Sequence, residues 1–181
     1  VIAGTGAKGA TGDGGPATAA TFNGIHNFVV LRNGDLLLAD SFNSLLRRIE
    51  AKTGMVTTVA GGAKKGFAGD GGPAKDALFS TLIEIALNPA GTKLYCADIG
   101  NRRVRCIDLA TNIITTVAGN GKAGVPADGA EAVNASLLGP RAVRPYAEGD
   151  FYVLERNGNA LRYVDAAGKI IAEGRKMASL P

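Results

Sequence analysis

The chain has 181 residues, 46% of them hydrophobic, which is enough for one sizeable core and too apolar for a disordered protein. Its net charge of +4 comes from scattered lysines and arginines, with 6% aromatic residues and no tryptophan, which disfavours nucleic acid as a partner. No apolar run approaches the roughly 18 residues that a membrane-spanning helix needs, so no membrane partner is expected.

The chain contains three copies of one unit. Val59 follows Ile2 by 57 residues, Val117 follows Val59 by 58, and Ala-Gly comes after each. Other positions recur at the same spacing, namely Asp13, Asp70 and Asp128, then Phe22, Phe79 and Leu137, then Asp40, Asp98 and Glu155. Such a period is typical of solenoids, propellers and arrays, whose units bury their apolar faces against their neighbours. We expect units at residues 1–58, 59–116 and 117–181.

Four short strands are predicted in the first copy. They are rich in Val, Leu, Ile and Thr and lie at His26–Leu31, Asp35–Asp40, Leu45–Ile49 and Met55–Val59. Asn33-Gly34 and Lys52–Gly54 supply turn residues between neighbouring strands. The later copies place equivalent turns at Pro89–Thr92, Ala110–Asn112, Glu148–Asp150 and Ala166–Gly168.

Short strands joined by short turns predict an antiparallel four-stranded meander, and no helical periodicity competes with it. A four-stranded sheet repeated in tandem is a propeller blade. The predicted fold class is therefore an all-β propeller with three blades in this chain. A β-solenoid fits less well, because its repeats are normally shorter.

A glycine-rich link precedes the first strand of a copy, as in Gly12–Ala17 and Gly69–Ala74. A phosphate-binding glycine loop leads into a helix, and an EF-hand calcium loop carries several acidic ligands and a terminal Glu. Neither pattern occurs here. We therefore expect compact turns in which Asp13 and Asp70 accept backbone hydrogen bonds.

Two cysteines, Cys96 and Cys106, lie on either side of a turn in the second copy only. They replace Leu38 and Arg48 of the first copy. Two interpretations stay open, a disulfide across the hairpin or two small, partly buried thiols. Since His26 is the single histidine, the thiols lack partners for a metal site, and no metal or other cofactor is expected.

Two stretches resemble the NHL repeat, one comprising Gly34–Asp40, Asn43 and Arg47–Ile49, the other Lys93–Arg105. The flanking Thr57–Gly61 and the Gly-Asp-Gly-Gly-Pro-Ala segments are similar to those of a long-repeat bacterial subgroup. The resemblance covers nearly the whole chain. The third copy departs from it at Ala127–Glu131 and at Glu155–Asn159.

The resemblance implies a β-propeller, commonly six-bladed, that serves as an interaction platform, and it favours a bacterial extracytoplasmic location. It assigns the motif residues to blade architecture at the turn between the second and third strands, namely Asp40, Asp98, Arg47 and Arg105. Some related propellers are enzymes, such as peptide-amidating lyases, whose metal is held by several histidines. One histidine cannot supply such a site alone.

Three blades do not close a ring at ordinary blade twist, and both end faces would be apolar. Val1–Gly4 has the pattern of the last strand of a preceding blade, and Lys176–Pro181 that of the start of a following link. Two alternatives stay open. The chain is a piece of a longer propeller with additional blades, or it forms a homodimer whose half-rings make six blades.

Positions that differ between the copies are the candidates for binding. The entrance of the first strand holds His26, Ile83 and Arg141, and the next position holds Asn27, Glu84 and Ala142. These positions lie near the propeller axis, where a protein or small-molecule ligand is expected to bind. Arg141 and Arg144 near Glu84 would form either an anion site or a surface ion pair. An aromatic and cationic patch of the kind found in protein interfaces is formed by Tyr146, Tyr152 and Arg156.

No catalytic set is evident in the sequence. The serines Ser41, Ser44, Ser80 and Ser136 have one histidine between them as a base, and the recurring aspartates fall on different blades. The leading hypothesis is a non-catalytic propeller segment that binds a protein or a ligand. The alternatives are a portion of a propeller lyase or hydrolase whose catalytic ligands lie outside this segment, and a self-assembling structural module.

Overall fold

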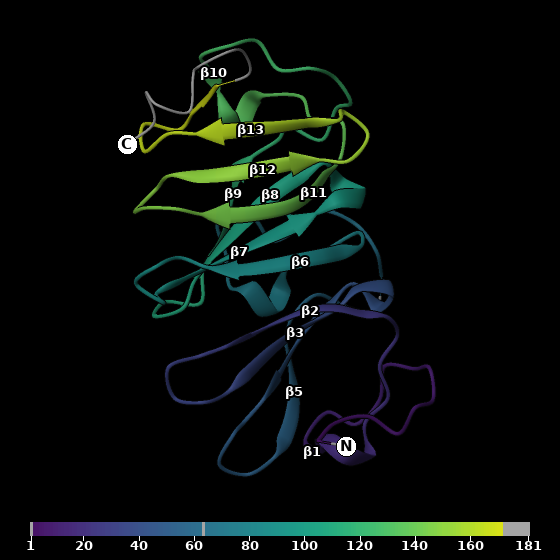
Figure 1. Cartoon of the computed structure of the whole chain (residues 1–181). Helices are drawn as coiled ribbons and strands as arrows, with labels where there is room; N and C mark the ends of the chain where they lie inside the picture. The colour runs from purple at the N-terminus through teal and green to yellow at the C-terminus, as the bar shows by residue number, and fades with distance from the viewer. Residues whose placement is uncertain (1, 63, 172–181) are drawn as a thin grey trace.

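The computed structural model describes residues 2–62 and 64–171, which form three antiparallel sheets (Figure 1). The first blade contains β2 (Ile25–Val30), β3 (Leu36–Asp40), β4 (Leu45–Ile49) and β5 (Met55–Ala60). The second contains β6 (Leu82–Leu87), β7 (Lys93–Asp98), β8 (Arg103–Asp108) and β9 (Ile114–Ala118). The third contains β11 (Pro140–Pro145), β12 (Phe151–Glu155), β13 (Ala160–Val164) and β14 (Lys169–Ile171). The predicted all-β propeller segment with three blades is confirmed.

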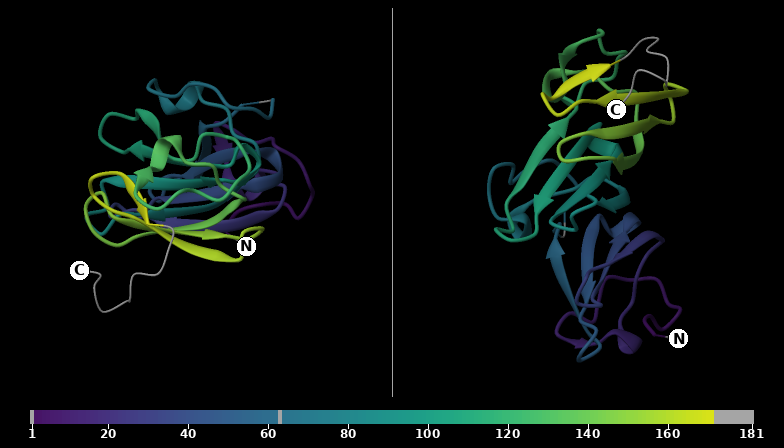
Figure 2. Two further views of the ribbon diagram at one scale, coloured as in Figure 1. Left: turned by 90° about the horizontal axis from the view of Figure 1, so that it is seen from above. Right: turned by 60° about the vertical axis from the view of Figure 1, so that its left-hand side comes forward.

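Neighbouring strands within a blade are also neighbours in the sequence, as a meander requires. The innermost strands β2, β6 and β11 pack against one another from blade to blade. Figure 2 shows the first blade, in purple and blue, and the third, in green and yellow, at opposite ends with the second between them. Single 3₁₀ turns lie at Ala17–Ala19, Ser41–Asn43, Ala74–Asp76, Ile99–Asn101 and Ala132–Asn134.

The turn between β2 and β3 is a three-residue loop. Leu31 N–H donates to Asp35 O at 2.8 Å, and Gly34 N–H donates to Leu31 O at 2.9 Å. Gly34 has a φ of 87°, a left-handed conformation that glycine adopts without a steric penalty. The predicted Asn33-Gly34 turn is therefore present, with one more residue in the loop than the shortest hairpins have.

Each glycine-rich link folds back along the outer edge of the blade that follows it. In the first blade β1 (Gly15–Pro16) pairs with β5, and in the third β10 (Ala130–Glu131) pairs with β14. In the second blade Gly71 N–H donates to Ile114 O at 2.7 Å. Gly69 belongs to this link, and a Cβ there would lie 2.6 Å from Ala77 Cα. The links thus cover sheet edges that would otherwise expose unpaired backbone groups.

The hydrophobic cores lie between the blades. Between the first and second, Leu37 and Leu46 pack with Ile85 and Leu94, and Phe79 of the link is fully buried among them. Between the second and third blades, a similar core contains Tyr95, Val104, Val143, Phe151 and Val153. Each blade therefore buries its face against its neighbour, as the repeat predicts.

The register of β7 and β8 decides between the two interpretations of the cysteines. Tyr95 lies opposite Cys106, and Cys96 lies opposite Arg105, so the two thiols point to opposite faces of the sheet. Cys96 packs in the core toward the first blade and Cys106 in the core toward the third. Both cysteines are free, and the disulfide is excluded.

The two end faces expose large apolar side chains. On the first blade Phe28 is 58% exposed and Val30 55%, and on the third Leu154 is 46% exposed and Leu161 59%. The expected following link, Lys176–Pro181, lies outside the described residues, as does Val1 of the expected preceding strand. No helix in the described part of the chain is long and apolar enough to cross a membrane.

Candidate functional site

A buried arginine ties each of the first two blades to its own link. Arg47 of β4 is fully buried, and its Nη2 lies 2.8 Å from Asp13 Oδ1 and donates to Thr11 O at 3.2 Å. Its Nη1 lies farther, 3.6 Å, from Asp40 Oδ2. The Arg47 guanidinium also lies 5.3 Å from the centre of the Phe22 ring. The nearest carboxylate therefore comes from the link rather than from the neighbouring strand.

The second blade repeats this arrangement. Arg105 of β8 is fully buried and lies 3.0 Å from Asp70 Oδ1. Its guanidinium donates to Leu78 O at 3.0 Å and to Ala68 O at 3.2 Å. It lies 5.5 Å from the centre of the Phe79 ring. These contacts fix the link, the outer edge and the third strand in one arrangement.

The carboxylate that ends the second strand closes the following turn. Asp98 Oδ1 accepts from Ser80 N–H at 2.8 Å, and its Oδ2 accepts from the Asn101 side-chain amide at 2.6 Å. Burial raises the pKa of Asp98 to about 6, against the lowering effect of these hydrogen bonds. Asp40 makes the same two contacts in the first blade, with Asn23 and Asn43. Burial also raises the pKa of Asp40.

The third blade uses a longer side chain at this position. Glu155 Oε1 accepts from Leu138 N–H, and its Oε2 accepts from Arg162 Nε at 2.9 Å. The extra methylene lets Glu155 reach the arginine directly, which Asp40 does only at a longer distance. In all three blades these recurring charges hold the scaffold together.

The positions that differ between the blades lie on the innermost strands. Glu84 of β6 forms an ion pair with Arg144 of β11, joining the second and third blades. The Arg144 side chain is 63% exposed, whereas Glu84 is only 12% exposed. Arg144 lines a hollow of about 270 Å³ together with Asn27, Phe28 and Ile85, so side chains of all three innermost strands meet there. We call this the axial hollow.

Asn27 lines the axial hollow and carries a buried polar atom without a partner among the described residues. Its Oδ1 atom is buried and accepts no hydrogen bond from the described residues. A buried carbonyl oxygen without a donor is costly, and such groups in native proteins usually meet water or a ligand. Among the residues singled out from the sequence, the structure places Asn27 and Arg144 at the same hollow and pairs Glu84 with Arg144.

The other predicted residues lie elsewhere. His26 Nδ1 lies 2.8 Å from Gly24 O, and the His26 ring lies edge-on to Phe42 at 5.2 Å. Arg141 lines a separate hollow of about 450 Å³ beside Leu154 and Arg156. Both side chains thus stand outside the axial hollow.

The tyrosines of the third blade form a row on its outward face. The Tyr146 and Tyr152 rings lie 6.3 Å apart, and the Tyr152 and Tyr163 rings lie 5.2 Å apart. Tyr146 is 51% exposed. Such amphipathic rings are common in protein interfaces.

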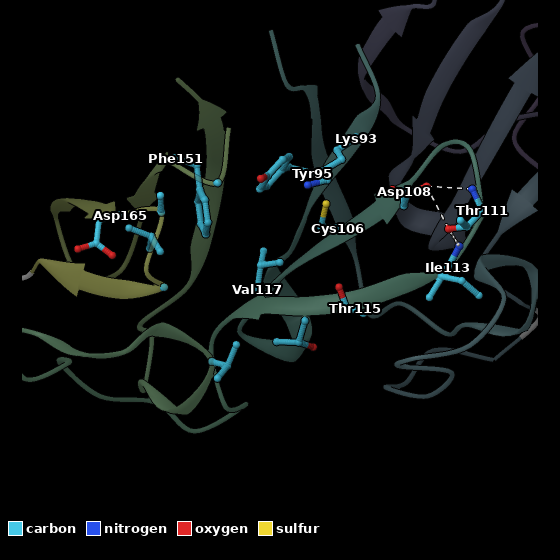
Figure 3. A pocket seen from close by; sticks show the side chains of 16 residues that line it. Lys93, Tyr95, Cys106, Asp108, Thr111, Ile113, Thr115, Val117, Phe151 and Asp165 are labelled. Atoms are coloured by element: carbon cyan, nitrogen blue, oxygen red, sulfur yellow. Dashed lines mark hydrogen bonds between the residues drawn. The ribbon is translucent and has the colours of Figure 1, made fainter. Parts of the chain in front are cut away.

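A larger hollow, about 600 Å³, lies between the second and third blades (Figure 3). Tyr95 and Cys106 line it from the second blade and Phe151 from the third, with the Tyr95 and Phe151 rings 5.2 Å apart. Lys93, Asp108 and Asp165 stand around them. We call this the second groove. The sequence analysis did not identify it as a site.

A smaller hollow, about 240 Å³, lies between the first and second blades, and we call it the first groove. Arg48 lines it from the position that Cys106 holds in the next blade, since Arg48 pairs with Leu37 and Cys106 with Tyr95. The exchange of arginine for cysteine was the sequence signal that could have located the second groove. Its volume depends on packing between blades, which the sequence does not give.

No group of three or more His, Cys, Asp or Glu side chains that would hold a metal occurs in residues 2–62 and 64–171. Burial raises the pKa of Cys106 to about 11, so this thiol is protonated at neutral pH.

No protein-family model matches the chain. It is 28% identical over 134 residues to the Arabidopsis thaliana protein SUPPRESSOR OF QUENCHING 1, chloroplastic, covering 71% of this chain and 12% of that protein. It is 33% identical over 103 residues to mouse Teneurin-1, covering 50% of this chain and 4% of that protein. The chain thus spans a small part of the curated relatives that it matches.

Solved structures with a similar fold are β-propellers. An auxiliary nutrient binding protein from Bacteroides ovatus aligns with a TM-score of 0.61 and 19% identity, covering 83% of this chain and 36% of that chain. A structural genomics protein from Bacteroides thetaiotaomicron aligns with a TM-score of 0.63 and 21% identity, covering 81% and 34%. Virginiamycin B lyase from Staphylococcus aureus aligns with a TM-score of 0.51 and 15% identity, covering 82% and 40%. These similarities establish the fold.

Proposed function

We propose that this chain is a non-catalytic, NHL-type propeller segment that binds a ligand or a protein at the axial hollow. The observation that carries the proposal is that the recurring polar residues and the variable ones have different contacts. The recurring Asp and Arg side chains are engaged in the scaffold, whereas the variable residues Asn27 and Arg144 line one hollow and Glu84 pairs with Arg144. Arg144, whose side chain is 63% exposed, presents donors there.

The chemistry of the axial hollow favours a ligand with both an acceptor and a donor. Arg144 suits a carboxylate or carbonyl oxygen, and Glu84, which is paired with it, suits an N–H or O–H group. The apolar side chains of Phe28 and Ile85 beside them suit a small apolar body. Amino acids, short peptides and sugars meet this description to different degrees. Auxiliary nutrient binding proteins among the similar structures are in keeping with a small-molecule ligand.

The proposal is tested by screening amino acids, dipeptides and monosaccharides with ligand-observed NMR against the whole chain. Arg144→Gln and Glu84→Gln should each weaken the binding of a hit by about 3- to 10-fold, the usual effect of losing one hydrogen-bond partner or the charge that orients it. Arg156→Gln, on the outer blade face, is the matched control and should leave binding unchanged. Equal binding by all variants would contradict the proposal.

The same screen separates binding from catalysis. A binding protein returns its ligand chemically unchanged after long incubation. Conversion of a hit into a lyase or hydrolysis product by the purified chain would favour the alternative, a portion of a propeller enzyme, over the proposal.

We also propose that the apolar end faces are covered in the working protein. Further blades would cover Phe28 and Val30 at one end and Leu154 and Leu161 at the other, and so would a second copy closing a six-bladed ring. Light scattering on a size-exclusion column distinguishes these cases. The mass of one chain, 18.4 kDa, favours further blades, whereas twice that mass favours the homodimer.

A further inference from the structure

The second groove has the features of a small-molecule site that is separate from the axial hollow. Its volume, about 600 Å³, falls within the range of roughly 300–1,000 Å³ typical of ligand pockets. Its walls are mainly apolar, with the Tyr95 and Phe151 rings at the centre, as Figure 3 shows. Both blades that form it are anchored by buried arginine–carboxylate pairs, Arg105–Asp70 and Arg162–Glu155. The groove is therefore preformed rather than dependent on a moving loop.

The first groove shows which kind of group the space between two blades can hold. There the chain supplies the occupant itself, because the Arg48 side chain lines the hollow and pairs with Asp35. Arg48 is a cationic group on an aliphatic stem. At the equivalent position of the second groove Cys106 ends at its sulfur atom, and the hollow grows from about 240 to about 600 Å³. An occupant of the second groove would take the place of the missing arginine.

The charges around the second groove also favour a cation. Lys93, the one cation lining it among the described residues, forms an ion pair with Glu148 from the third blade. Asp108 and Asp165 remain as carboxylates at the groove. Within the described residues the hydrogen bonds of both use Oδ1, from Thr111 and Lys169 among others, so Oδ2 of each keeps its lone pairs for a donor.

Two further properties of the lining suit an organic cation with an apolar body. The hydrogen bond from Thr111 N–H lowers the pKa of Asp108, which keeps this carboxylate ionised at neutral pH. The apolar body can contact Val133, which is 44% exposed, beside the Tyr95 and Phe151 rings, which are almost fully buried in the lining. A neutral or anionic ligand would gain the apolar contacts but no attraction to the carboxylates, of which Asp108 also has the charge of Lys93 nearby.

We propose that the groove between the second and third blades binds a small organic cation, an amine or guanidinium carried on an aliphatic or aromatic body. The cation lies beside one of the two carboxylates, Asp108 or Asp165, which Figure 3 shows on opposite sides of the groove, and the body lies along the apolar lining between them. The proposal is independent of the axial hollow, since the two sites share no lining residue.

The test compares three probes of similar shape on the whole chain, namely phenethylamine, 2-phenylethanol and 3-phenylpropanoate. Ligand-observed NMR titration gives the dissociation constant of each. Phenethylamine should bind about 5-fold more tightly than 2-phenylethanol, the gain expected of a solvent-accessible ion pair, and 3-phenylpropanoate should bind most weakly. Equal binding of the three probes would overturn the proposal.

The location is tested with variants and with thiol labelling. Cys106→Arg places an arginine in the groove at the position of Arg48, with Lys93 where Arg48 has Asp35, and should weaken phenethylamine binding by at least about 10-fold, because it occupies the hollow and adds a positive charge. Asp108→Asn combined with Asp165→Asn changes only charge at partly exposed positions and should remove the preference for the amine. Phenethylamine should also slow the alkylation of Cys106 by N-ethylmaleimide.

Cys96 provides an internal control, because it faces the other side of the same sheet and is fully buried. Its alkylation should be slow and unaffected by the amine. Binding that survives in Cys106→Arg, or Cys106 alkylation that is unaffected at saturating amine, would place the ligand elsewhere and refute the proposal. Loss of binding in Arg144→Gln would likewise point to the axial hollow.

Discussion

The first and second grooves are lined by equivalent positions of successive blades, but the side chains at these positions differ. In the first, Arg48 pairs with Asp35, whose carboxylate also accepts from Ala51 N–H at 2.8 Å. The Ala51 hydrogen bond, together with Arg48, lowers the pKa of Asp35 against the effect of burial. In the second groove Cys106 and Lys93 occupy the positions of Arg48 and Asp35, and Lys93 pairs across the interface with Glu148. Two exchanges thus convert a groove filled by its own side chain into an open one.

The difference shows how a repeat protein separates stability from binding. Arg47 and Arg105 occupy the same buried position in successive blades and make equivalent contacts. Arg48 and Cys106, one residue farther along the same strands, face the groove instead. Because strand neighbours point to opposite faces, one position can hold the link while the next varies freely.

The largest effect is expected from the buried arginines. Arg47→Met and Arg105→Met should each lower the free energy of unfolding by about 3–5 kcal/mol, because each removes the positive charge beside a fully buried carboxylate, Asp40 or Asp98, and the donor to the link. Arg48→Met should cost only about 1 kcal/mol, since Arg48 is partly exposed and Asp35 keeps its backbone hydrogen bond. Urea denaturation measures all three. A cost for Arg105→Met no greater than for Arg48→Met would refute the division into scaffold and groove positions.

The next effect is a pH dependence centred on Asp98. Burial raises its pKa from an ordinary 3.8 to about 6, so between these values the folded state binds a proton that the unfolded state does not. The resulting stability is present below about pH 4 and is lost as the pH rises through about 6, a difference of roughly 3 kcal/mol. Asp98→Asn cannot ionise and should flatten this part of the stability profile, which urea denaturation at several pH values measures.

Asp108→Asn is the matched control for this experiment. Hydrogen bonding from Thr111 lowers the pKa of Asp108, so its contribution is present above the ordinary pKa and is lost as the pH falls. The two variants should therefore change the profile in opposite directions. A parallel change in both would mean that Asp98 is not the group that titrates near pH 6.

Much of the blade could be predicted from the sequence, because its determinants are local. The expected strand Leu45–Ile49 is β4 without a shift, and the expected His26–Leu31 is displaced by one residue in β2. The carboxylate that pairs most closely with Arg47 could not be predicted from the sequence. Spacing within the blade pairs it with Asp40, but the link returns along the outer edge and places Asp13 closer. That contact depends on how the chain folds back over 34 residues.

The candidate sites show the same limit. Sequence differences between the copies drew attention to Glu84 and Arg144, which do meet as an ion pair. They also identified Cys106 in place of Arg48, but not the hollow that this exchange leaves. The hollow needs Phe151 from another blade to form its opposite wall. A site made by two units is visible only when the units are placed together.

The smallest effect comes from giving the second blade the residues of the first at its two cysteines. Cys96 is fully buried among Ile85, Leu94 and Ile107, so Cys96→Leu, which copies Leu38, should overpack the core and cost about 1–3 kcal/mol. Cys106→Arg, which copies Arg48, extends into the second groove and should cost within about 1 kcal/mol. Urea denaturation compares the two directly. The arginine adds more atoms than the leucine. If Cys106→Arg nevertheless lowered the free energy of unfolding more than Cys96→Leu, the second groove would be closed in solution and both interfaces of the second blade would be tightly packed.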